Sequence, residues 1–408
     1  MFPVIEKLDD LLPHIKDNPN FVVNKKDDYY VVDYIISDPA SWVNPYTYEC
    51  RGILFDDAGR IMSRRYHKFF NLNERPETSI DKIDLSKKHW ILEKLDGSMI
   101  TPFYSNVVGT DLPKIINWEN GIIVNYGNNN IVWGSKAGAT FLTPQIEEFV
   151  KSHPIYLYFA LDMMNNGFTP IFEWCSNKNR IVISYPEDRL VLTAIRNTVE
   201  GNYLPYESML EYQKFYPGIE IIKQYKGTVQ NMLQFSDDVK SMQGIEGFVI
   251  RFEDGQMIKM KCDEYVLYHK SKNDLQFEKN VVAIIAEGRA DDFRVLLSEE
   301  DRDKFESFER AFWYGIYNTS EWWIGWLDLY NHNRMTRKEY AIEYSKKFNH
   351  SAFLKSIIFK FFDEDLFPLK SKKLIHDEIL SIIKRNTSSQ TNIDKVRELW
   401  NNVKWVYS

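Results

Sequence analysis

Hydrophobic residues in the first two thirds of the chain form short runs that polar turns interrupt. β-branched and aromatic residues dominate these runs, as is typical of strands, and glycine or asparagine often follows them. The runs predict strands at residues 29–36, 50–55, 90–92, 99–100, 171–174 and 190–195. A helix over residues 144–149 is expected to cover the resulting sheet, and residues 127–130 are expected to form a turn.

Two further β-like runs, residues 247–252 and 256–261, lie on either side of Glu253-Asp254-Gly255. An Asp-Gly pair between two such runs is the strongest short-range signal for a hairpin. Lys259 and Lys261 lie two positions apart in the second run, so on a strand they share one face. The sequence therefore predicts a β-hairpin that presents two lysines on the same side.

The hydrophobic period changes near residue 270, where apolar residues begin to recur every three or four positions. Ser298 is followed three residues later by Asp301, as is typical of a helix N-terminus. Phe305, Phe308 and Phe312 continue at helical spacing. The tryptophans of this part are expected to lie mainly in its core: Trp313, Trp322, Trp323 and Trp326.

These patterns predict an α+β protein with two domains, and a chain of 408 residues is long enough to form both. Residues 1–268 should form a domain of antiparallel sheets, and residues 269–408 should form an all-helical domain. The net charge of −7 is not the charge of a protein that coats nucleic acid without specificity. A local basic groove remains compatible with it.

Three cysteines, none in a Cys-x-x-Cys arrangement, favour a reducing compartment. No apolar run reaches the roughly 18 residues that a membrane span needs. The N-terminus also lacks the basic and apolar regions of a signal peptide. We therefore expect a soluble, cytoplasmic protein, with no membrane partner.

The first candidate for a catalytic site is the polar stretch Glu93-Lys94-Leu95-Asp96-Gly97-Ser98, which separates two apolar runs. Lys94 would stand at the rim of a sheet, Gly97 would permit a tight turn, and Asp96 could face the same side as Lys94. A lysine held in a pocket can act as a nucleophile once its amine is neutral. The competing interpretation is a surface turn with a solvated lysine, which is much the commoner case for so short a motif.

Other charged residues stand inside or beside predicted strands, where they contribute little to stability. Taken singly, each is more often a solvated edge residue or part of an ion pair. Taken together they are what nucleotidyl transfer needs, because cations hold a triphosphate while carboxylates bind a metal or a ribose hydroxyl. The set is Arg51, Lys68, Glu173, Glu246, Lys259 and Lys261.

In this order the motifs resemble those of the covalent nucleotidyltransferases, and within them the phage RNA ligase 1 family typified by the bacteriophage T4 enzyme. Lys94-Leu95-Asp96-Gly97-Ser98 resembles the nucleophile motif, and residues 49–55 and 68–74 resemble two upstream blocks. Glu173 with residues 179–182, residues 245–249 and residues 259–261 resemble the third, fourth and fifth motifs. DNA ligases and capping enzymes favour Arg where this chain has Met99, which also favours an RNA ligase.

The resemblance implies an ATP-dependent RNA ligase in which Lys94 takes up AMP, transfers it to an RNA 5′-phosphate, and lets an RNA 3′-hydroxyl displace it. It also implies the roles of individual residues. Glu173, Glu246, Lys259 and Lys261 would act with Lys94 in catalysis, and Glu246 would bind Mg²⁺, or Mn²⁺ in its place. The residues implied to contact ATP are Tyr34, Arg51, Lys68, Phe70, Lys94, Gly97, Lys136, Glu173, Lys259 and Lys261.

Asp291 and Asp292 resemble a metal-binding pair of the family, although an acidic pair at a helix N-terminus explains them equally well. The expected partner is single-stranded RNA or a nicked tRNA, repaired by a monomer during phage infection, with the helical domain selecting the RNA. Two alternatives stay open. One is a capping-type guanylyltransferase, and the other is a non-catalytic RNA-binding protein that keeps a dead ligase core.

Overall fold

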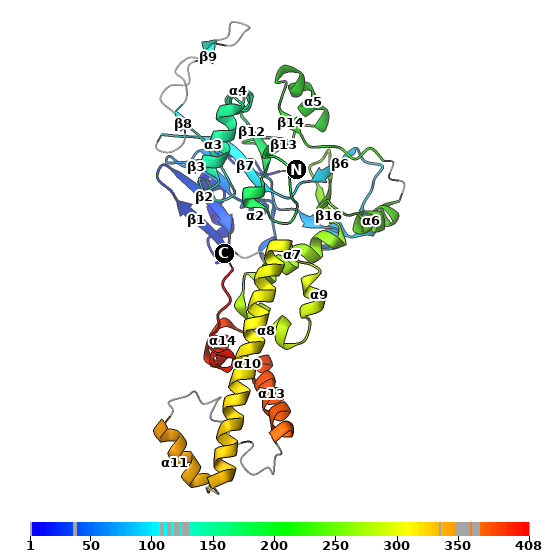
Figure 1. Cartoon of the computed structure of the whole chain (residues 1–408). Helices are drawn as coiled ribbons and strands as arrows, with labels where there is room; N and C mark the ends of the chain where they lie inside the picture. Colours follow the sequence, from blue (N-terminus) through cyan, green and yellow to red (C-terminus); the bar gives the residue numbers. More distant parts are fainter. Residues whose placement is uncertain are drawn as a thin grey trace. The chain divides into compact units, whose positions relative to one another are not determined.

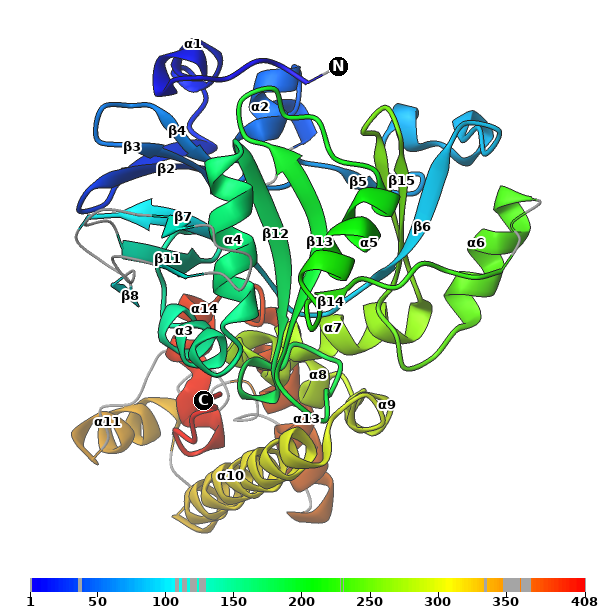
Figure 2. The ribbon, with the colours of Figure 1, turned by 90° about the horizontal axis from the view of Figure 1, so that it is seen from above.

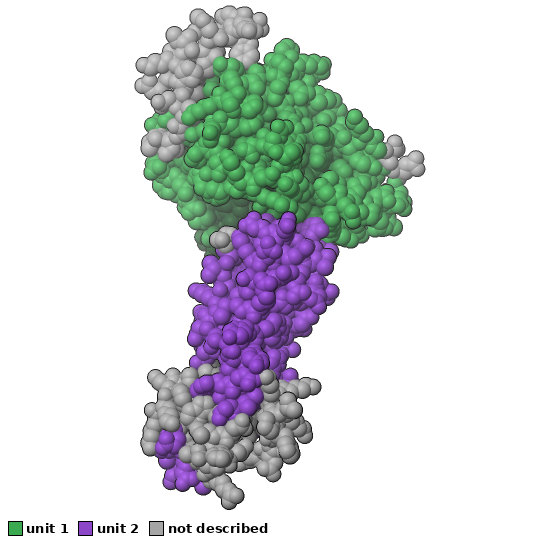
Figure 3. All heavy atoms as spheres, viewed as in Figure 1, with its two compact units in different colours: residues 1–266 green, residues 267–408 purple. Residues whose placement is uncertain are grey.

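The computed structural model describes residues 2–35, 39–106, 110–111, 116–117, 123–124, 130–227, 229, 231–333, 336–347, 360 and 368–407. These residues divide into two compact units, Met1–Val266 and Leu267–Ser408, coloured separately in Figure 3. The division lies close to the expected domain boundary at residues 268 and 269. No helix in the described segments is both long and apolar enough to span a membrane.

Three sheets of four or more strands form the framework of unit 1 (Figures 1 and 2). The first has the order β1-β2-β3-β4, with bounds Phe21–Lys25, Tyr29–Tyr34, Ile53–Asp56 and Ile61–Ser63. The second has the order β14-β13-β12-β7-β11-β8, with bounds Glu220–Ile221, Arg189–Asn197, Phe168–Cys175, Ser98–Ser105, Asn130–Gly134 and Thr110–Asp111. The third has the order β5-β16-β15-β6, with bounds Phe70–Asn71, Met257–Lys261, Gly247–Phe252 and His89–Lys94.

Most strand pairs are antiparallel, and the described exceptions are β13 with β14 and β16 with β5. A short pair, β9 (Ile116–Asn117) and β10 (Ile123–Val124), is antiparallel too. The β12–β13 pairing shifts register between Ile171 and Phe172, and such a shift bends the strand pair locally. Glu173 follows directly after this shift.

Helices cover the outer faces of the second and third sheets (Figure 2). α3 (Thr143–Ser152) and α4 (Ile155–Asn165) bury Ile146 and Phe159 in one core with Phe172 and Trp174 of β12. α5 (Tyr206–Phe215) adds to the same core, and α6 (Met232–Ser241) packs on β15 and β16 through Phe235. The shorter helices are α1 (Leu12–Ile15), α2 (Pro45–Glu49), and the 3-10 turns Leu8–Asp10, Pro39–Ser41, Pro76–Thr78, Ile80–Lys82 and Asn177–Asn179.

Unit 2 is helical in its described residues, as the change of period near residue 270 predicts. Its helices are α7 (Asp263–Leu275), which begins in unit 1, then α8 (Glu278–Ala286), α9 (Ala290–Arg294), α10 (Glu299–Asn333), α11 (Arg337–Lys347), α13 (Pro368–Arg385), α14 (Gln390–Val396) and the 3-10 turn Arg397–Trp400. α10 begins where Ser298 accepts a hydrogen bond from the Asp301 amide at 3.2 Å. Its Phe305 and Phe312 are fully buried against α8, α13 and the Trp400 segment.

The predicted tryptophan core holds for three of the four residues. Trp323 is fully buried, and Trp313 and Trp322 are partly buried against the same core, whereas the side chain of Trp326 lies outside the described residues. The predicted strands and the hairpin at residues 247–261 are confirmed, with two differences at strand ends. The strand predicted at residues 29–36 ends at Tyr34, and residue 36 lies outside the described residues. Residues 50–51 leave α2 in a turn, and the next strand begins only at Ile53. Asn130 begins β11, and the rest of the predicted turn at residues 127–130 lies outside the described residues.

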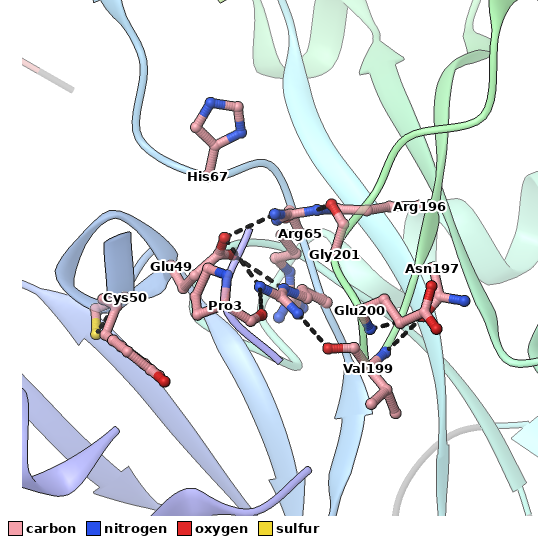
Figure 4. A network of polar contacts seen from close by, with 12 residues as sticks. Pro3, Glu49, Cys50, Arg65, His67, Arg196, Asn197, Val199, Glu200 and Gly201 are labelled. Carbon is pink, nitrogen blue, oxygen red and sulfur yellow. Dashed lines mark hydrogen bonds and ion pairs between the residues drawn. The ribbon is translucent and has the colours of Figure 1, made fainter. Parts of the chain in front are cut away.

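A buried ion network fixes the segment that precedes Arg51 (Figure 4). The Glu49 carboxylate accepts hydrogen bonds from Arg64 Nε at 3.1 Å and Arg196 Nη2 at 2.7 Å. Their remaining nitrogens donate to backbone oxygens of Val199, Pro3, Gly201 and Arg65. Burial alone would raise the pKa of Glu49, but Arg196 and Arg64 lower it to about 2. The network is a closed structural element, with every partner supplied by the chain.

Candidate active site

The third sheet presents a ladder of paired residues on one face. In the first rung, Gly247 of β15 pairs with Lys94 of β6 and with Lys261 of β16. In the second rung Val249 pairs with Leu92 and Lys259, and in the third Arg251 pairs with Trp90 and Met257. Because successive rungs are two residues apart, all three point to the same side of the sheet. Most of these side chains line one cleft of about 760 Å³.

Gly247 is required at the centre of the first rung. Its φ of +141° is one that side-chain-bearing residues rarely adopt, and a Cβ there would lie 1.9 Å from the Met260 carbonyl oxygen. The strand can therefore pass between Lys94 and Lys261 only where glycine stands.

Glu246 bridges the two lysines of the first rung. Its Oε2 lies 2.7 Å from Lys94 Nζ and its Oε1 lies 3.0 Å from Lys261 Nζ. The Glu246 side chain is only 3% exposed, whereas Lys94 and Lys261 are 22% and 28% exposed and reach the cleft. The arrangement neutralises a buried carboxylate and leaves each ammonium group with donors that face the open side.

The opposite wall of the cleft comes from the second sheet and from two loops. Glu173 of β12 pairs with Met99 of β7, and both line the cleft. Burial raises the pKa of Glu173 to about 7, with Glu246 adding to the rise and Lys94 opposing it. Lys136 lies 3.0 Å from Asp33 and 3.6 Å above the Tyr34 ring, so it enters the cleft already paired.

Arg51 and Lys259 are basic residues of this cleft with no ion-pair partner among the described residues. Arg51 Nη1 is buried without a hydrogen-bond acceptor there. Burial lowers the pKa of Lys259 to about 6, helped by Arg51 and Lys94, and its Nζ lies 4.5 Å from the Phe69 ring centroid. A cleft that gathers basic residues without acidic partners suits an anionic ligand such as a triphosphate, which favours the charged form of Lys259.

Asp96 does not face the same side as Lys94, which corrects the expectation from their spacing. β6 ends at Lys94, and Asp96 is buried, where it accepts hydrogen bonds at 2.7 Å each from the Val182 and Ile183 amides and the Tyr265 hydroxyl. The carboxylate thus ties the lysine loop to the residues that follow Glu173 and to the first turn of α7. Its role in this structure is to hold the loop in place.

Gly97 is needed because the second sheet approaches the lysine loop closely. A Cβ on Gly97 would lie 2.4 Å from the Trp174 carbonyl oxygen and 3.1 Å from Glu173 Cγ. Alanine there would push Glu173 and Lys94 apart.

The structure brings most of the predicted site residues around this one cleft. Arg51, Lys94, Gly97, Lys136, Glu173, Lys259 and Lys261 line it, and Glu246 joins two of them. Tyr34, Lys68 and Phe70 do not line it, although Tyr34 contacts Lys136. Lys68 and Phe70 line a second hollow of about 380 Å³, and Phe70 is only 5% exposed in a core with Trp42.

The cleft residues that the sequence prediction did not include are numerous, and Asp33, Tyr66 and Arg251 are among them. Asp33 and Tyr66 carry no local signal, because their partners are distant in the sequence. Arg251 carried one, since it is the single charged residue in the apolar run Gly247–Phe252.

The metal that the family resemblance implies is compatible with the cleft. No group of three or more histidine, cysteine or acidic residues that could hold an ion occurs in the described part of the chain. Mg²⁺, however, usually takes only one or two protein carboxylates and completes its shell with water and substrate phosphates. Glu173 lines the cleft, and the Glu246 carboxylate lies between two of its lysines, so the chain offers Mg²⁺ these two carboxylates.

Asp291 and Asp292 belong to unit 2, in the first turn of α9. Asp291 forms an ion pair with Arg294, one turn further along the helix. This contact fits the alternative interpretation as acids at a helix N-terminus, and their metal-binding role stays a prediction.

The sequence profile of a family of RNA ligases matches residues 49–274, more than half of the chain. The chain belongs to the RNA ligase family of the T4 RNA ligase 1 type. The matched region of this RNA ligase family member begins at the network residue Glu49 and ends in α7, so it includes the whole ladder, Glu173 and Lys136.

Two curated relatives resemble part of the chain. A Thermovibrio ammonificans protein assigned by name as an RNA ligase is 30% identical over 272 residues, covering 64% of this chain and 63% of that protein. RNA ligase 1 of bacteriophage TS2126 is 22% identical over 238 residues, covering 57% and 54%. The chain therefore matches less than two thirds of the length of either relative.

Among solved structures, an archaeal ATP-dependent RNA ligase is 14% identical with a TM-score of 0.39, covering 71% of this chain and 68% of that one. A likeness at this level supports no conclusion about fold or function.

Proposed function

We propose that the protein is an ATP-dependent RNA ligase that joins an RNA 5′-phosphate to an RNA 3′-hydroxyl. The observation that carries this proposal is Glu246 held between Lys94 and Lys261, in a cleft where Arg51 and Lys259 are unpaired. Family membership supports the reaction class. The cleft volume of about 760 Å³ is within the usual range for a nucleotide-sized ligand.

In the first step the Lys94 amine attacks the α-phosphorus of ATP, a P–N bond forms, and pyrophosphate leaves. An ammonium group has no lone pair, so Lys94 must give up its contact with Glu246 and lose one proton to water in the cleft before it can attack. A bound Mg²⁺ would supply positive charge that competes for Glu246 and offsets charge on the phosphates. Arg51, Lys259 and Lys261 then hold the triphosphate oxygens, and Glu173 accepts from the ribose hydroxyls.

In the second step an oxygen of the RNA 5′-phosphate attacks the AMP phosphorus, and the Lys94 nitrogen leaves with its electron pair. In the third step the RNA 3′-hydroxyl attacks the 5′-phosphorus of the adenylated strand, and AMP leaves. The same cations act at each step, because each transition state places negative charge on non-bridging phosphate oxygens.

The test uses the full-length protein with labelled ATP and magnesium, followed by a denaturing gel and a chase with 5′-phosphorylated RNA. The expected result is a labelled protein band that disappears as label enters RNA. Lys94→Ala should give no band, yet should still seal RNA that already carries a 5′-adenylate. Labelling of the Lys94→Ala protein would contradict the assignment.

Labelled GTP run in parallel separates the ligase from a capping-type guanylyltransferase, which would be labelled by GTP instead. A protein labelled by neither nucleotide would support the non-catalytic alternative.

We further propose that the substrate is a single-stranded RNA or a nicked tRNA, repaired by a monomer in the cytoplasm during phage infection. The similarity to a phage RNA ligase 1 supports this context. Unit 2 would select the RNA, since a nucleotide pocket reads one residue whereas recognition by shape needs a wider surface.

A stripe on α10 offers a way to test unit 2. Arg310, Tyr314 and Tyr317 are exposed at positions i, i+4 and i+7, and an arginine beside two tyrosines can stack on unpaired bases. Substitution of all three by alanine should lower the preference for nicked tRNA over linear RNA several-fold, without altering lysyl-AMP formation. Full-length protein is required, because ending the chain near residue 294 would remove Phe305 and Phe312 from the core of unit 2.

A further inference from the structure

Arg251 is a buried cation in the cleft with no hydrogen-bond acceptor. Its side chain is 1% exposed, and its Nε, Nη1 and Nη2 all lack a partner among the described residues. Its guanidinium lies 5.2 Å above the Trp90 ring, which orients it without satisfying its N–H groups. A guanidinium has five donors, and leaving them unpaired in a buried position is costly.

The three other buried arginines of unit 1 differ from it. Arg64 and Arg196 donate to Glu49 and to backbone oxygens, and Arg65 donates to the backbone oxygens of Gly52 and Gly134. In unit 1 the chain therefore supplies acceptors for buried guanidiniums elsewhere. At Arg251 it supplies none, and this residue lines the cleft.

The ladder shows what could reach it. Arg251 lies in the third rung and the Lys94 nucleophile in the first, roughly 14 Å apart along the strands at about 3.4 Å per residue. Between them the second rung offers the apolar Leu92 and Val249, on which a flat ring can lie. Thr193 and Tyr66 line the same cleft as Arg251. Burial lowers the pKa of Arg251, and the nearby Tyr66 opposes that shift.

We infer that Arg251 is a specificity residue that donates a hydrogen bond to a ring nitrogen of the purine of the bound nucleotide. The inference rests on the proposed function, because it needs a nucleoside phosphate whose α-phosphorus sits at Lys94. Its base would extend over Leu92 and Val249 and present its acceptor edge to the guanidinium. A guanidinium can only donate, so the partner on the base must be an unprotonated nitrogen or a carbonyl oxygen.

The experiment measures lysyl-nucleotide formation with ATP and with its 1-deaza, 3-deaza and 7-deaza analogues, in wild type and in Arg251→Met. Methionine keeps an unbranched stem in the pocket but removes the donors. With ATP, Arg251→Met should lose roughly 10- to 100-fold in kcat/KM, the range for a lost hydrogen bond from a charged donor. One deaza analogue should cause a similar loss in wild type and little further loss in Arg251→Met.

Arg189→Met is the matched control, because Arg189 lies on β13, pairs with Glu220 and does not line the cleft. It should show wild-type sensitivity to all three analogues. Thermal unfolding gives a second measurement: Arg251→Met should unfold at a higher temperature, since it removes an unpaired buried charge.

Equal losses with ATP and every analogue, together with a lower unfolding temperature, would assign Arg251 a structural role only and overturn the inference. A better rate with GTP than with ATP, lost in Arg251→Met, would place a guanine at this position and support the residue's role while correcting the nucleotide. A wild-type protein that forms no lysyl-nucleotide would instead contradict the proposed function.

Discussion

Two carboxylates of unit 1 each lie between two cations, and they differ in what else those cations contact. Glu49 lies between Arg64 and Arg196, both fully buried, whose other nitrogens are bonded to backbone oxygens (Figure 4). Glu246 lies between Lys94 and Lys261, which keep part of their surface open to the cleft. The Glu49 arrangement uses the donors of its arginines within the chain, whereas the Glu246 arrangement leaves lysine donors that can bind a ligand.

The choice of cation matches this difference. Arginine presents a planar fork of donors that suits fixed, multiple acceptors, whereas lysine carries a compact charge that loses its proton more readily when buried. A network built from arginines stabilises a fold, and a network built from lysines can exchange partners. The contrast teaches that a carboxylate bridging two cations becomes a site only where its cations have unused bonds.

The largest effect on activity is expected from removing the charge of the exchanging carboxylate. Glu246→Gln should lower lysyl-AMP formation roughly 10³-fold, because the transition state loses several kcal/mol of metal-assisted stabilisation. Its midpoint in urea should change little, since glutamine still accepts from one lysine. Rates measured across a magnesium titration check this, and an unchanged titration curve would show that Glu246 does not bind the metal.

The closed network should respond in the opposite way. Glu49→Gln should lower the free energy of unfolding by about 3–5 kcal/mol, because it leaves two arginines buried without their counter-charge. Urea unfolding at pH 7 measures it. The loss should shrink on acidification: the wild-type carboxylate has a folded pKa of about 2, below its unfolded value, so its contribution is present above the unfolded pKa and fades as the pH falls towards 2. If the Glu49→Gln protein were as stable as wild type, the Glu49 network would not be a stabilising element, and its contrast with the Glu246 arrangement would fail.

The smallest effect is expected on the number of protons that the protein takes up when ATP binds. Lys259, with a pKa of about 6, is neutral at pH 8 in the free protein, and a triphosphate beside it favours the charged form. ATP binding at pH 8 should therefore take up about one proton, and the affinity should fall as the pH rises above 6. Calorimetry in buffers of different ionisation enthalpy measures this uptake.

Lys259→Met should abolish the proton uptake. It should also weaken ATP binding roughly 10-fold, which is the effect expected from losing one charge-assisted hydrogen bond. Lys214→Met, which alters an exposed lysine paired with Glu211 on α5, serves as the control. An uptake that persists in Lys259→Met would assign the proton to another group.

The local part of this site could be predicted from the sequence. The two-residue period placed Lys259 and Lys261 on one face, and the Asp-Gly turn paired their strand with residues 247–252. The same two-residue period gave a wrong orientation for Asp96. The strand ends at Lys94, so the alternation of side chains between the two faces does not continue to Asp96. Arg51 was placed at the start of a strand, but Asn44 caps α2, and this helix continues to Glu49.

The contacts that join distant segments were beyond sequence reasoning. Glu246 reaches Lys94 across some 150 positions, and nothing near either residue signals the pair. Lys68 and Phe70 belong to a block that resembles the family, yet their segment turns them towards a second hollow, and a motif match does not specify that direction. Arg251, by contrast, could have been predicted as a site residue from the sequence, because a charged residue inside an apolar strand indicates a role other than stability.

The three cysteines give the protein a property of practical use. Cys50 precedes Arg51, Cys175 follows Glu173 by two positions, and Cys262 follows Lys261, and all three thiols are buried. Burial raises the pKa of each, that of Cys175 to about 12, so thiolate is scarce at neutral pH. Alkylating reagents should then reach these thiols only when the surrounding sheets open. The rate of thiol labelling would therefore measure how fast the structure around the candidate active-site cleft unfolds, at three positions at once. A dye on a cysteine introduced at the surface would report from one position alone.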